Sequence, residues 1–321
     1  MVLRDVMETR TASDQSKLGV AMTAFSFMMW GLLVVYWKAL DVYDVNAAET
    51  LAHRIVWALV FTAGVLTLQG RWGELARSIS TRRDLARVAA SALLLGVNWF
   101  TYVWAINHSR VLETSLGYFI APLVSVLLGC LVLKERLSRW QVTAIALAGA
   151  GVALRLTVCL LQQGRIPWVA AALAVTFSTY GLLRKTARAE SLPGLVAETA
   201  LLAVPALVFL ALLHRVGRGT LGNCPPQAAA LLVATGVVTA LPLLCFAYGA
   251  RRVKLSTVGF LQYLAPSCTF LLGVFAYGEA FTASRAVAFG LTWLGLAIYS
   301  WESLRSRRQG RGAATVPAPG G

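Results

Sequence analysis

The chain has 321 residues, of which 58% are hydrophobic and 13% are charged. Soluble domains carry nearer a quarter charged residues, so this composition excludes an ordinary soluble protein. The formal net charge of +15 does not point to nucleic acid as a partner, because the basic residues lie in short connections between apolar segments.

Ten segments are apolar and long enough to cross a bilayer, which requires about 20 residues. They cover residues 18–38, 46–68, 87–107, 113–133, 140–160, 166–184, 194–213, 227–249, 256–277 and 284–302. We therefore predict an all-α integral membrane protein with ten transmembrane helices. The N-terminal tail covers 1–17, and the basic C-terminal tail, 303–321, is expected to be disordered.

The distribution of Lys and Arg predicts the orientation. Of the 29 basic residues, 21 fall on the side that holds both termini and 8 on the other side. Cytoplasmic connections carry an excess of Lys and Arg, so both termini are expected in the cytoplasm.

The sequence contains an internal repeat. Residues 24–33 (A-F-S-F-M-M-W-G-L-L) align with residues 174–183 (A-V-T-F-S-T-Y-G-L-L). The chain thus divides into two five-helix repeats, 18–160 and 166–302. Because five is an odd number, the second repeat crosses the membrane upside down. Inverted repeats are typical of secondary transporters, whose binding sites lie at the repeat interface.

A polar stripe occurs once in each repeat at helical spacing, so that its members share one helix face. In the first repeat it consists of Ser115, Tyr118, Pro122, Ser125 and Gly129. In the second repeat it consists of Gly259, Gln262, Pro266, Thr269 and Gly273. We expect both faces to line a solute path. The alternatives are close helix packing through small residues and static kinks at the prolines.

Three ionisable residues open the second segment: Glu49, His53 and Arg54. Charges inside spans are costly and usually face a cavity or pair with each other. We interpret them as a gating or coupling cluster that binds a proton or the charged group of a solute. The alternative is an interfacial ion pair. Glu49 has a repeat counterpart in Glu198, which suggests a shared role in gating, whereas His53 and Arg54 have no charged counterparts.

Further polar and aromatic residues are candidates for the cavity wall. Asn98 and Tyr102 share a face of one segment, and Asn107 lies near its outer end. Ring faces for an apolar or cationic solute are available from Trp30, Trp99, Trp104, Tyr118, Tyr180 and Tyr263. The alternative for the rings is an interfacial aromatic belt.

No cofactor or metal site is expected, because the three histidines and five cysteines lack ligand spacing. Cys159 and Cys224 fall on the same predicted outer side, which leaves a disulfide open. Ala144 and Ala148 have the small-xxx-small spacing of helix interfaces, which leaves a homodimer open.

The chain resembles the EamA family of the drug/metabolite transporter superfamily, and within it the RarD-type transporters. The resemblance is carried by Glu49, His53-Arg54, Asn98-Trp99, Trp104 to Asn107, Glu113 through Pro122-Leu123, Gly259 to Tyr263, and Pro266. Where relatives often have Asn before the first of these prolines, this chain has Ala121. The resemblance implies a central cavity lined by spans 3, 4, 8 and 9 and gated by spans 1, 2, 6 and 7.

These observations together predict a secondary transporter, an exporter or exchanger, that moves a small organic solute across a bacterial inner membrane by alternating access. The alternative is a receptor or regulatory protein built on the same scaffold. An enzyme is disfavoured because the titratable residues form no catalytic arrangement.

Overall fold

The computed structural model describes residues 2–164, 166–278 and 283–313, and every regular element in these ranges is helical. The elements are α1 (Val2–Asp41), α2 (Ala47–Leu68), α3 (Trp72–Ser78), α4 (Arg82–Asn107), α5 (Val111–Leu131), α6 (Arg139–Gln163), α7 (Trp168–Thr186), α8 (Ser191–Arg215), α9 (Pro226–Ala250), α10 (Leu255–Gln262), α11 (Leu264–Leu271), the π-helix η1 (Leu272–Ala276) and α12 (Ala283–Ala313).

Eight helical segments of the described residues are long and apolar enough to cross a membrane. They lie in α1, α2, α4, α5, α6, α8 and α9 and in the stretch Leu255–Ala276. The prediction of an all-α, multi-pass membrane protein is therefore confirmed. α7 and α12 are not among the eight, so the count of ten stays a prediction. α7 has only 19 residues and carries Arg184 and Lys185 in its last turn, which lowers its hydropathy.

Two elements differ from the sequence prediction. The connection after residue 68 contains the short helix α3, which was not predicted. The tail from 303 was expected to be disordered, but α12 continues through Ala313, and residues 314–321 lie outside the described part of the chain. Both stretches are too polar for a hydropathy criterion to detect as helices.

Local chemistry explains where several helices begin and break. The side chain of Asn46 accepts a hydrogen bond from the backbone N–H of Ala48 and caps α2. Ser138 and Gln141 form a reciprocal capping box at the start of α6. Proline has no N–H to donate, so Pro266 leaves the carbonyl of Gln262 without its helical partner. The span is interrupted at that point, where α10 ends and α11 begins.

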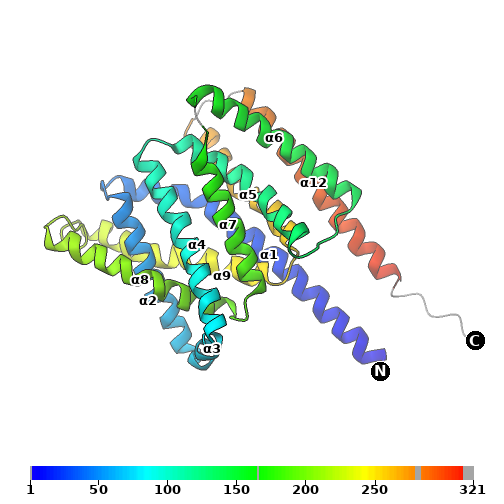
Figure 1. Cartoon of the computed structure of the whole chain (residues 1–321), viewed down its shortest axis with the longest axis horizontal. Coiled ribbons are helices and arrows are strands. Elements are labelled where there is room, and N and C mark those ends of the chain that lie inside the picture. The colour runs from blue at the N-terminus through cyan, green and yellow to red at the C-terminus, as the bar shows by residue number, and fades with distance from the viewer. Residues whose placement is uncertain (1, 165, 279–282, 314–321) are drawn as a thin grey trace, which may run out of the picture.

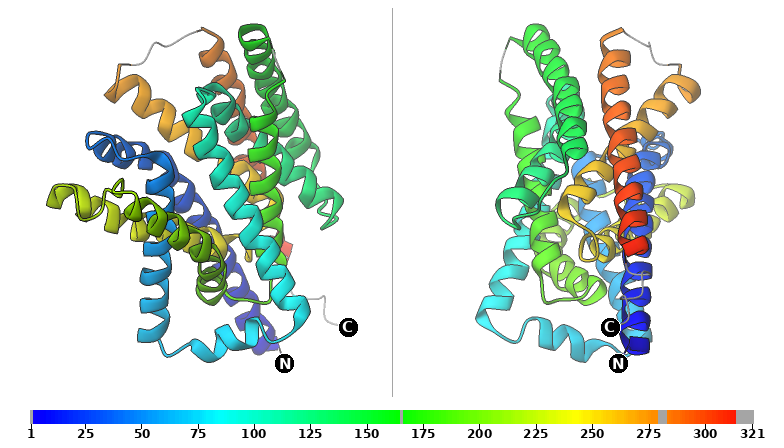
Figure 2. Two further views of the ribbon diagram at one scale, coloured as in Figure 1. Left: turned by 60° about the vertical axis from the view of Figure 1, so that its left-hand side comes forward. Right: turned by 90° about the vertical axis from the view of Figure 1, so that its right-hand side faces the viewer.

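The helices pack as a bundle in which distant parts of the chain lie side by side. α5 packs against α7 and α10, α1 against α9, and α2 against α8 and α9. α6 and α12 run together along one edge (Figures 1 and 2). Figure 2 also shows the N-terminal end of α1 and α3 at the same end of the molecule, toward which the C-terminal end of α12 points.

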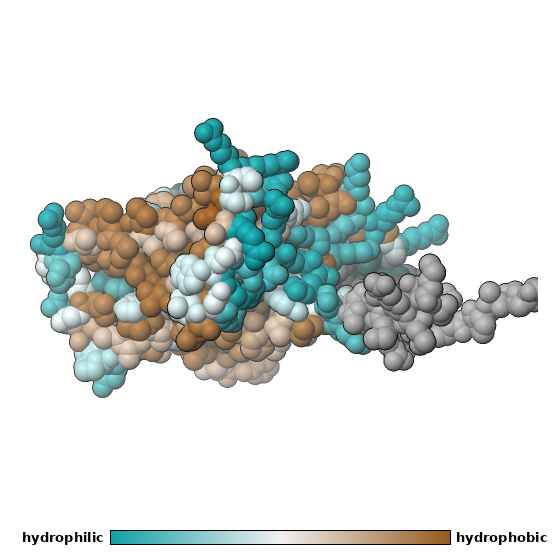
Figure 3. Space-filling model, turned by 90° about the horizontal axis from the view of Figure 1, so that it is seen from below, coloured by the Kyte–Doolittle hydropathy of each residue, from teal (hydrophilic) through white to brown (hydrophobic). Residues whose placement is uncertain are grey.

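The surface is rich in large apolar side chains. Leu93, Phe100, Leu161, Val204 and Phe275 are each more than 60% exposed. In the face drawn in Figure 3, hydrophobic side chains cover the left part, and hydrophilic ones gather along the middle. Large exposed apolar areas mark interaction surfaces, and here they fit contact with lipid.

The small residues of α6 are covered by the chain itself. Ala144 and Ala148 are fully buried, and a side chain at Gly295 of α12 would come within 2.7 Å of the Ala144 carbonyl oxygen. This face therefore serves contact between α6 and α12. Cys159 and Cys224 are both free thiols, so the disulfide left open by the sequence is not formed.

Candidate functional site

Arg54 lies on α2, where its guanidinium group is surrounded by aromatic rings. The guanidinium carbon lies 4.9 Å from the ring centre of Trp37 on α1 and 5.0 Å from that of Trp99 on α4. Its Nε donates a 3.1 Å hydrogen bond to Thr239 Oγ1 on α9. Arg54 is partly exposed, and no ion pair to it is found within the described ranges. The charge is thus held by rings and one hydroxyl group.

Two tyrosines extend this aromatic environment. Tyr102 on α4 and Tyr118 on α5 lie close enough to Arg54 to interact with it electrostatically. Their ring centres are 6.3 Å apart in an edge-to-face arrangement. Tyr118 is 49% exposed although α5 packs against α4, α7 and α10. Arg54, Trp37, Trp99, Tyr102 and Tyr118 together are called the Arg54 site below.

Glu49 and His53 face away from Arg54. One Glu49 oxygen lies 3.7 Å from His53 Nε2, and the two oxygens accept 2.6 and 2.7 Å hydrogen bonds from the Thr220 backbone N–H and hydroxyl. Both side chains are at least 95% buried, and His53 Nε2 has no hydrogen-bond partner. They line a cavity of about 260 Å³ with Trp57 and His214. Although all three residues lie on α2, Glu49 and His53 therefore face this cavity, whereas Arg54 faces the aromatic rings.

Glu198 belongs to a buried network at the opposite end of the bundle. It accepts hydrogen bonds from Ser91 (2.6 Å), Tyr180 (3.3 Å) and Arg184 (3.3 Å), and Arg184 is also buried. Arg184 also donates to the backbone carbonyl of Ser191, which lies at the start of α8. This network joins α4, α7 and α8.

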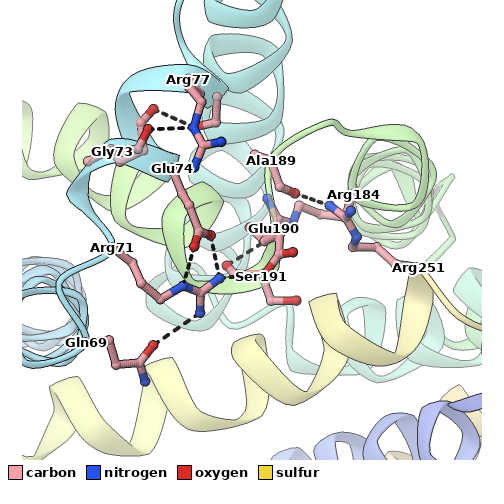
Figure 4. Close-up of polar contacts among 12 residues, drawn as sticks. Gln69, Arg71, Gly73, Glu74, Arg77, Arg184, Ala189, Glu190, Ser191 and Arg251 are labelled. Carbon is pink, nitrogen blue, oxygen red and sulfur yellow. Dashed lines mark hydrogen bonds and ion pairs between the residues drawn. The ribbon is translucent and has the colours of Figure 1, made fainter.

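A second group of charges lies beside that network (Figure 4). Arg71 is held between Glu74 at 2.6 Å and Glu190 at 2.6 Å. Its hydrogen bonds lower the pKa of Glu74 below its ordinary value of 4.5. Arg251 donates to the backbone carbonyls of Ala187 and Ala189, and burial, reinforced by nearby Arg184, lowers its pKa.

The predicted polar stripes meet in a chain of hydrogen bonds. Gln262 Nε2 donates to Ser125 Oγ at 2.9 Å, Ser125 donates to Ser178 Oγ at 3.0 Å, and Ser178 donates to the Ala121 carbonyl at 2.9 Å. Gln262 Oε1 is buried and has no partner. Tyr263 donates to the Phe119 carbonyl at 3.3 Å. These contacts bind α5, α7 and α10 to one another.

Other predicted cavity residues are engaged in packing. Asn98 donates to the Leu173 carbonyl and the Thr176 hydroxyl of α7. Trp30 packs among Phe27, Phe177 and Phe246.

The remaining candidates differ in their surroundings. Thr269 donates to the Gly31 carbonyl at 3.2 Å. A side chain at Gly259 would approach the Pro122 carbonyl to 2.7 Å, so close helix packing occurs there. Ser115 and Pro266 are partly buried, and Asn107 is exposed at the end of α4.

Four residues that take part in these contacts were not identified from the sequence: Trp37, Thr239, Ser178 and Arg184. Trp37 and Arg184 stand near helix ends, where sequence reasoning assigns aromatic and basic residues to the interface. Thr239 and Ser178 are single hydroxyl residues in apolar segments, which carry no distinguishing signal. Among the described residues, no group of three or more His, Cys, Asp or Glu side chains is arranged to hold a metal ion.

The comparisons with known proteins agree with this architecture. The model of the EamA-like transporter family matches residues 17–157 and 166–301. The chain is 42% identical over 300 residues to an uncharacterized transporter of Vibrio cholerae, covering 94% of this chain and 97% of that protein. It is 40% identical over 308 residues to the protein RarD of Streptomyces exfoliatus, covering 96% of each.

A solved crystal structure has the same fold. It superposes with a TM-score of 0.65 at 20% sequence identity, covering 87% of this chain and 96% of that chain. The family resemblance seen in the sequence is confirmed by the family model and by the similar proteins. The chain belongs to the EamA-like transporter family.

Proposed function

We propose that the protein is a secondary transporter that moves a small organic solute across the bacterial inner membrane by alternating access. The Vibrio cholerae relative is named an uncharacterized transporter, the family model is that of EamA-like transporters, and the apolar helices suit a multi-pass membrane protein. In this proposal ten helices form two inverted repeats, 18–160 and 166–302. The family model matches nearly the same two segments.

The helix contacts support the inverted duplication. The repeat pairs α1 with α7, α2 with α8, α4 with α9, α5 with the stretch α10–η1, and α6 with α12. Under this pairing the contact of α1 with α9 corresponds to that of α7 with α4, and the contact of α2 with α9 to that of α8 with α4. The contact of α5 with α7 likewise corresponds to the contacts of α1 with α10 and α11, as expected of two halves that rock against each other.

The observation that carries the proposal is the placement of the twin glutamates. Glu49 of α2 holds Thr220, just before α9, and Glu198 of α8 holds Ser91 of α4. α4 and α9 are repeat counterparts. Each glutamate therefore ties its own repeat to the corresponding region of the other one, at a connection for Thr220 and within a helix for Ser91. The two contacts lie at opposite ends of the bundle, which suits a pair of gates.

Solute counterflow in proteoliposomes tests the proposal. Vesicles containing purified protein are loaded with one unlabelled metabolite at a time, and uptake of the same labelled compound is followed. A transporter produces transient accumulation that depends on the internal solute. Binding of a solute without counterflow, measured by thermal shift, would support a receptor on the transporter scaffold instead.

The Glu49–His53 pair is proposed as the coupling site. Histidine titrates in the physiological range. His53 lines the cavity of about 260 Å³ together with Glu49, and its buried Nε2 has no hydrogen-bond partner. We expect His53→Gln to weaken the pH dependence of transport while pH-independent exchange persists. Unchanged rate and unchanged pH dependence would reduce the pair to a structural contact.

Both termini are proposed to be cytoplasmic, from the distribution of basic residues. In a cysteine-free background, a cysteine at exposed Ser80 should be shielded from an impermeant thiol reagent in whole cells, and one at exposed Asn223 should react. The reverse pattern would contradict the orientation.

A further inference from the structure

Arg54 differs from two other arginines in the bundle that are paired with carboxylates. Buried Arg184 is paired with Glu198, and Arg110 with Glu113. Arg54 has no such carboxylate within the described part of the chain. Glu49, the acid nearest to it in the sequence of α2, has both of its oxygens engaged by Thr220. A positive charge inside a span is costly when it is uncompensated, and such residues usually mark a functional site.

The two terminal nitrogens of the Arg54 guanidinium group are available to a ligand. Arginine has five N–H donors, and Nε of Arg54 is engaged by Thr239 Oγ1. For the terminal nitrogens, no hydrogen bond is found in the residues that the structure describes, and neither nitrogen is enclosed as a buried unpaired group. The two terminal nitrogens form the planar fork that fits a carboxylate with two parallel hydrogen bonds.

The surrounding rings fix the position of this fork. Trp37 and Trp99 approach the guanidinium at nearly equal distances from two different helices, which holds its plane without using its donors. Tyr102 and Tyr118 add ring surface nearby, and Tyr118 is half exposed. An unpaired cation, a free fork and accessible ring surface therefore occur together.

We propose that the Arg54 site binds the carboxylate of an organic monoanion, with the aromatic or apolar body of the solute against Tyr102 and Tyr118. This assignment of substrate class rests on the proposed transport function. A cationic solute is disfavoured because two of the rings already hold a cation, which would repel a second one. A single arginine compensates one negative charge, which favours a carboxylate over a phosphate dianion.

Binding to the purified protein in lipid nanodiscs tests the assignment. The probes are phenylacetate, its neutral counterpart phenylacetamide, the cation phenethylamine and the dianion phenyl phosphate. A ligand of the folded state raises the thermal unfolding midpoint in a concentration-dependent way. We expect phenylacetate to raise it, and the other three probes to have at most a weak effect.

Substitutions connect the response to the residue. Arg54→Gln should weaken phenylacetate binding at least about tenfold, because a charge-assisted hydrogen-bonding pair is lost. Arg54→Lys, which keeps the charge without the fork, should give an intermediate affinity. Arg252→Gln is the matched control, since Arg252 stacks on Tyr248 outside this site, and it should leave binding unchanged. If Arg54→Gln does not fold, Arg54→Lys and the preference for acid over amide provide the test.

The assignment is overturned if the amide, the amine or the phosphate matches the acid, if no acid response occurs, or if Arg54→Gln binds phenylacetate as the wild type does. Because binding is measured without transport, failure of this inference is separable from failure of the proposed function. Arg54-dependent binding without counterflow would contradict transport alone. Counterflow of a cation that is insensitive to Arg54→Gln would contradict the substrate class alone.

Discussion

Most polar side chains described inside the bundle form contacts between helices, and small neighbouring residues leave room for them. Arg184 is an example, because its guanidinium fits against Gly194 on the first turns of α8 while bonding to Glu198 and to the Ser191 carbonyl. A β-carbon at position 194 would overlap the guanidinium. The absence of a side chain there is therefore a condition for the network.

Gly194→Ala should consequently destabilise the protein. Overpacking a tight contact costs about 1–3 kcal/mol, and a displaced Arg184 would also lose its bond to Glu198. The apparent unfolding midpoint in detergent should fall. Gly149→Ala on α6 is the control, since no atom lies within 4 Å of its β-carbon position. That change should be neutral or stabilising by about 0.5–1 kcal/mol through helix propensity. Equal effects of both substitutions would contradict the role given to Gly194.

At the scale of elements, hydropathy predicts positions well and partners poorly. The start of α2 predicted at 46 and the end of α9 predicted at 249 differ from the structure by one residue each. Apolar runs carry that information directly. The identity of contacts is different, because Arg54 and His53 are adjacent in sequence yet face separate places. The packing of segments that are distant in the sequence decides which neighbours a helix face contacts. That packing cannot be inferred from hydropathy in a single sequence.

Helix α5 offers a test that separates water from lipid. Tyr118 is 49% exposed and Leu127 is 54% exposed on the same helix. If Tyr118 faces an aqueous solute path and Leu127 faces lipid, Tyr118→Cys should react rapidly with a small polar thiol reagent, and Leu127→Cys should react slowly. Thiol chemistry needs the thiolate, which forms in water and not in hydrocarbon. Equal labelling rates in a cysteine-free background would remove α5 from the path.

The attachment of α3 should depend on pH. Arg71 beside α3 holds both Glu74 and Glu190, and the pKa of Glu74 is lowered by that contact. A carboxylate with a depressed pKa contributes stability above its ordinary value of 4.5 and loses it as the pH falls further, through the folded-state value.

A spin label at exposed Ser80 reports on this segment. It should gain mobility as the pH falls below 4.5 in the wild-type background. In Arg71→Gln it should already be mobile near neutrality and change little with pH. A label whose mobility is independent of pH in both proteins would show that α3 is held by other contacts.

On the scale of the whole molecule, the two ends of the bundle differ. One end is closed by the buried Ser91–Glu198–Arg184 network. The Arg54 site lies nearer the other end, on the last turns of α1 and α4 and the first turns of α2 and α5, and it remains partly exposed. If both termini are cytoplasmic, as proposed, this arrangement corresponds to a state closed toward the cytoplasm and accessible from outside.

Glu198→Gln should shift that balance. Removing one partner of a buried ion pair leaves Arg184 uncompensated, at a cost of about 3–5 kcal/mol. Opening the cytoplasmic end hydrates Arg184, so the penalty applies mainly to the closed arrangement. The shift in population is then more than about 100-fold in favour of the inward-open state. Labelling of Tyr118→Cys by an impermeant reagent from outside should become correspondingly slower. Glu190→Gln is the matched control, because Glu190 lies at the same end of α8 in an ion pair in which its side chain is 63% exposed, and such pairs contribute about 0–1 kcal/mol. An unchanged labelling rate in Glu198→Gln, in a protein that still folds, would mean that the network is structural and that the cytoplasmic gate lies elsewhere.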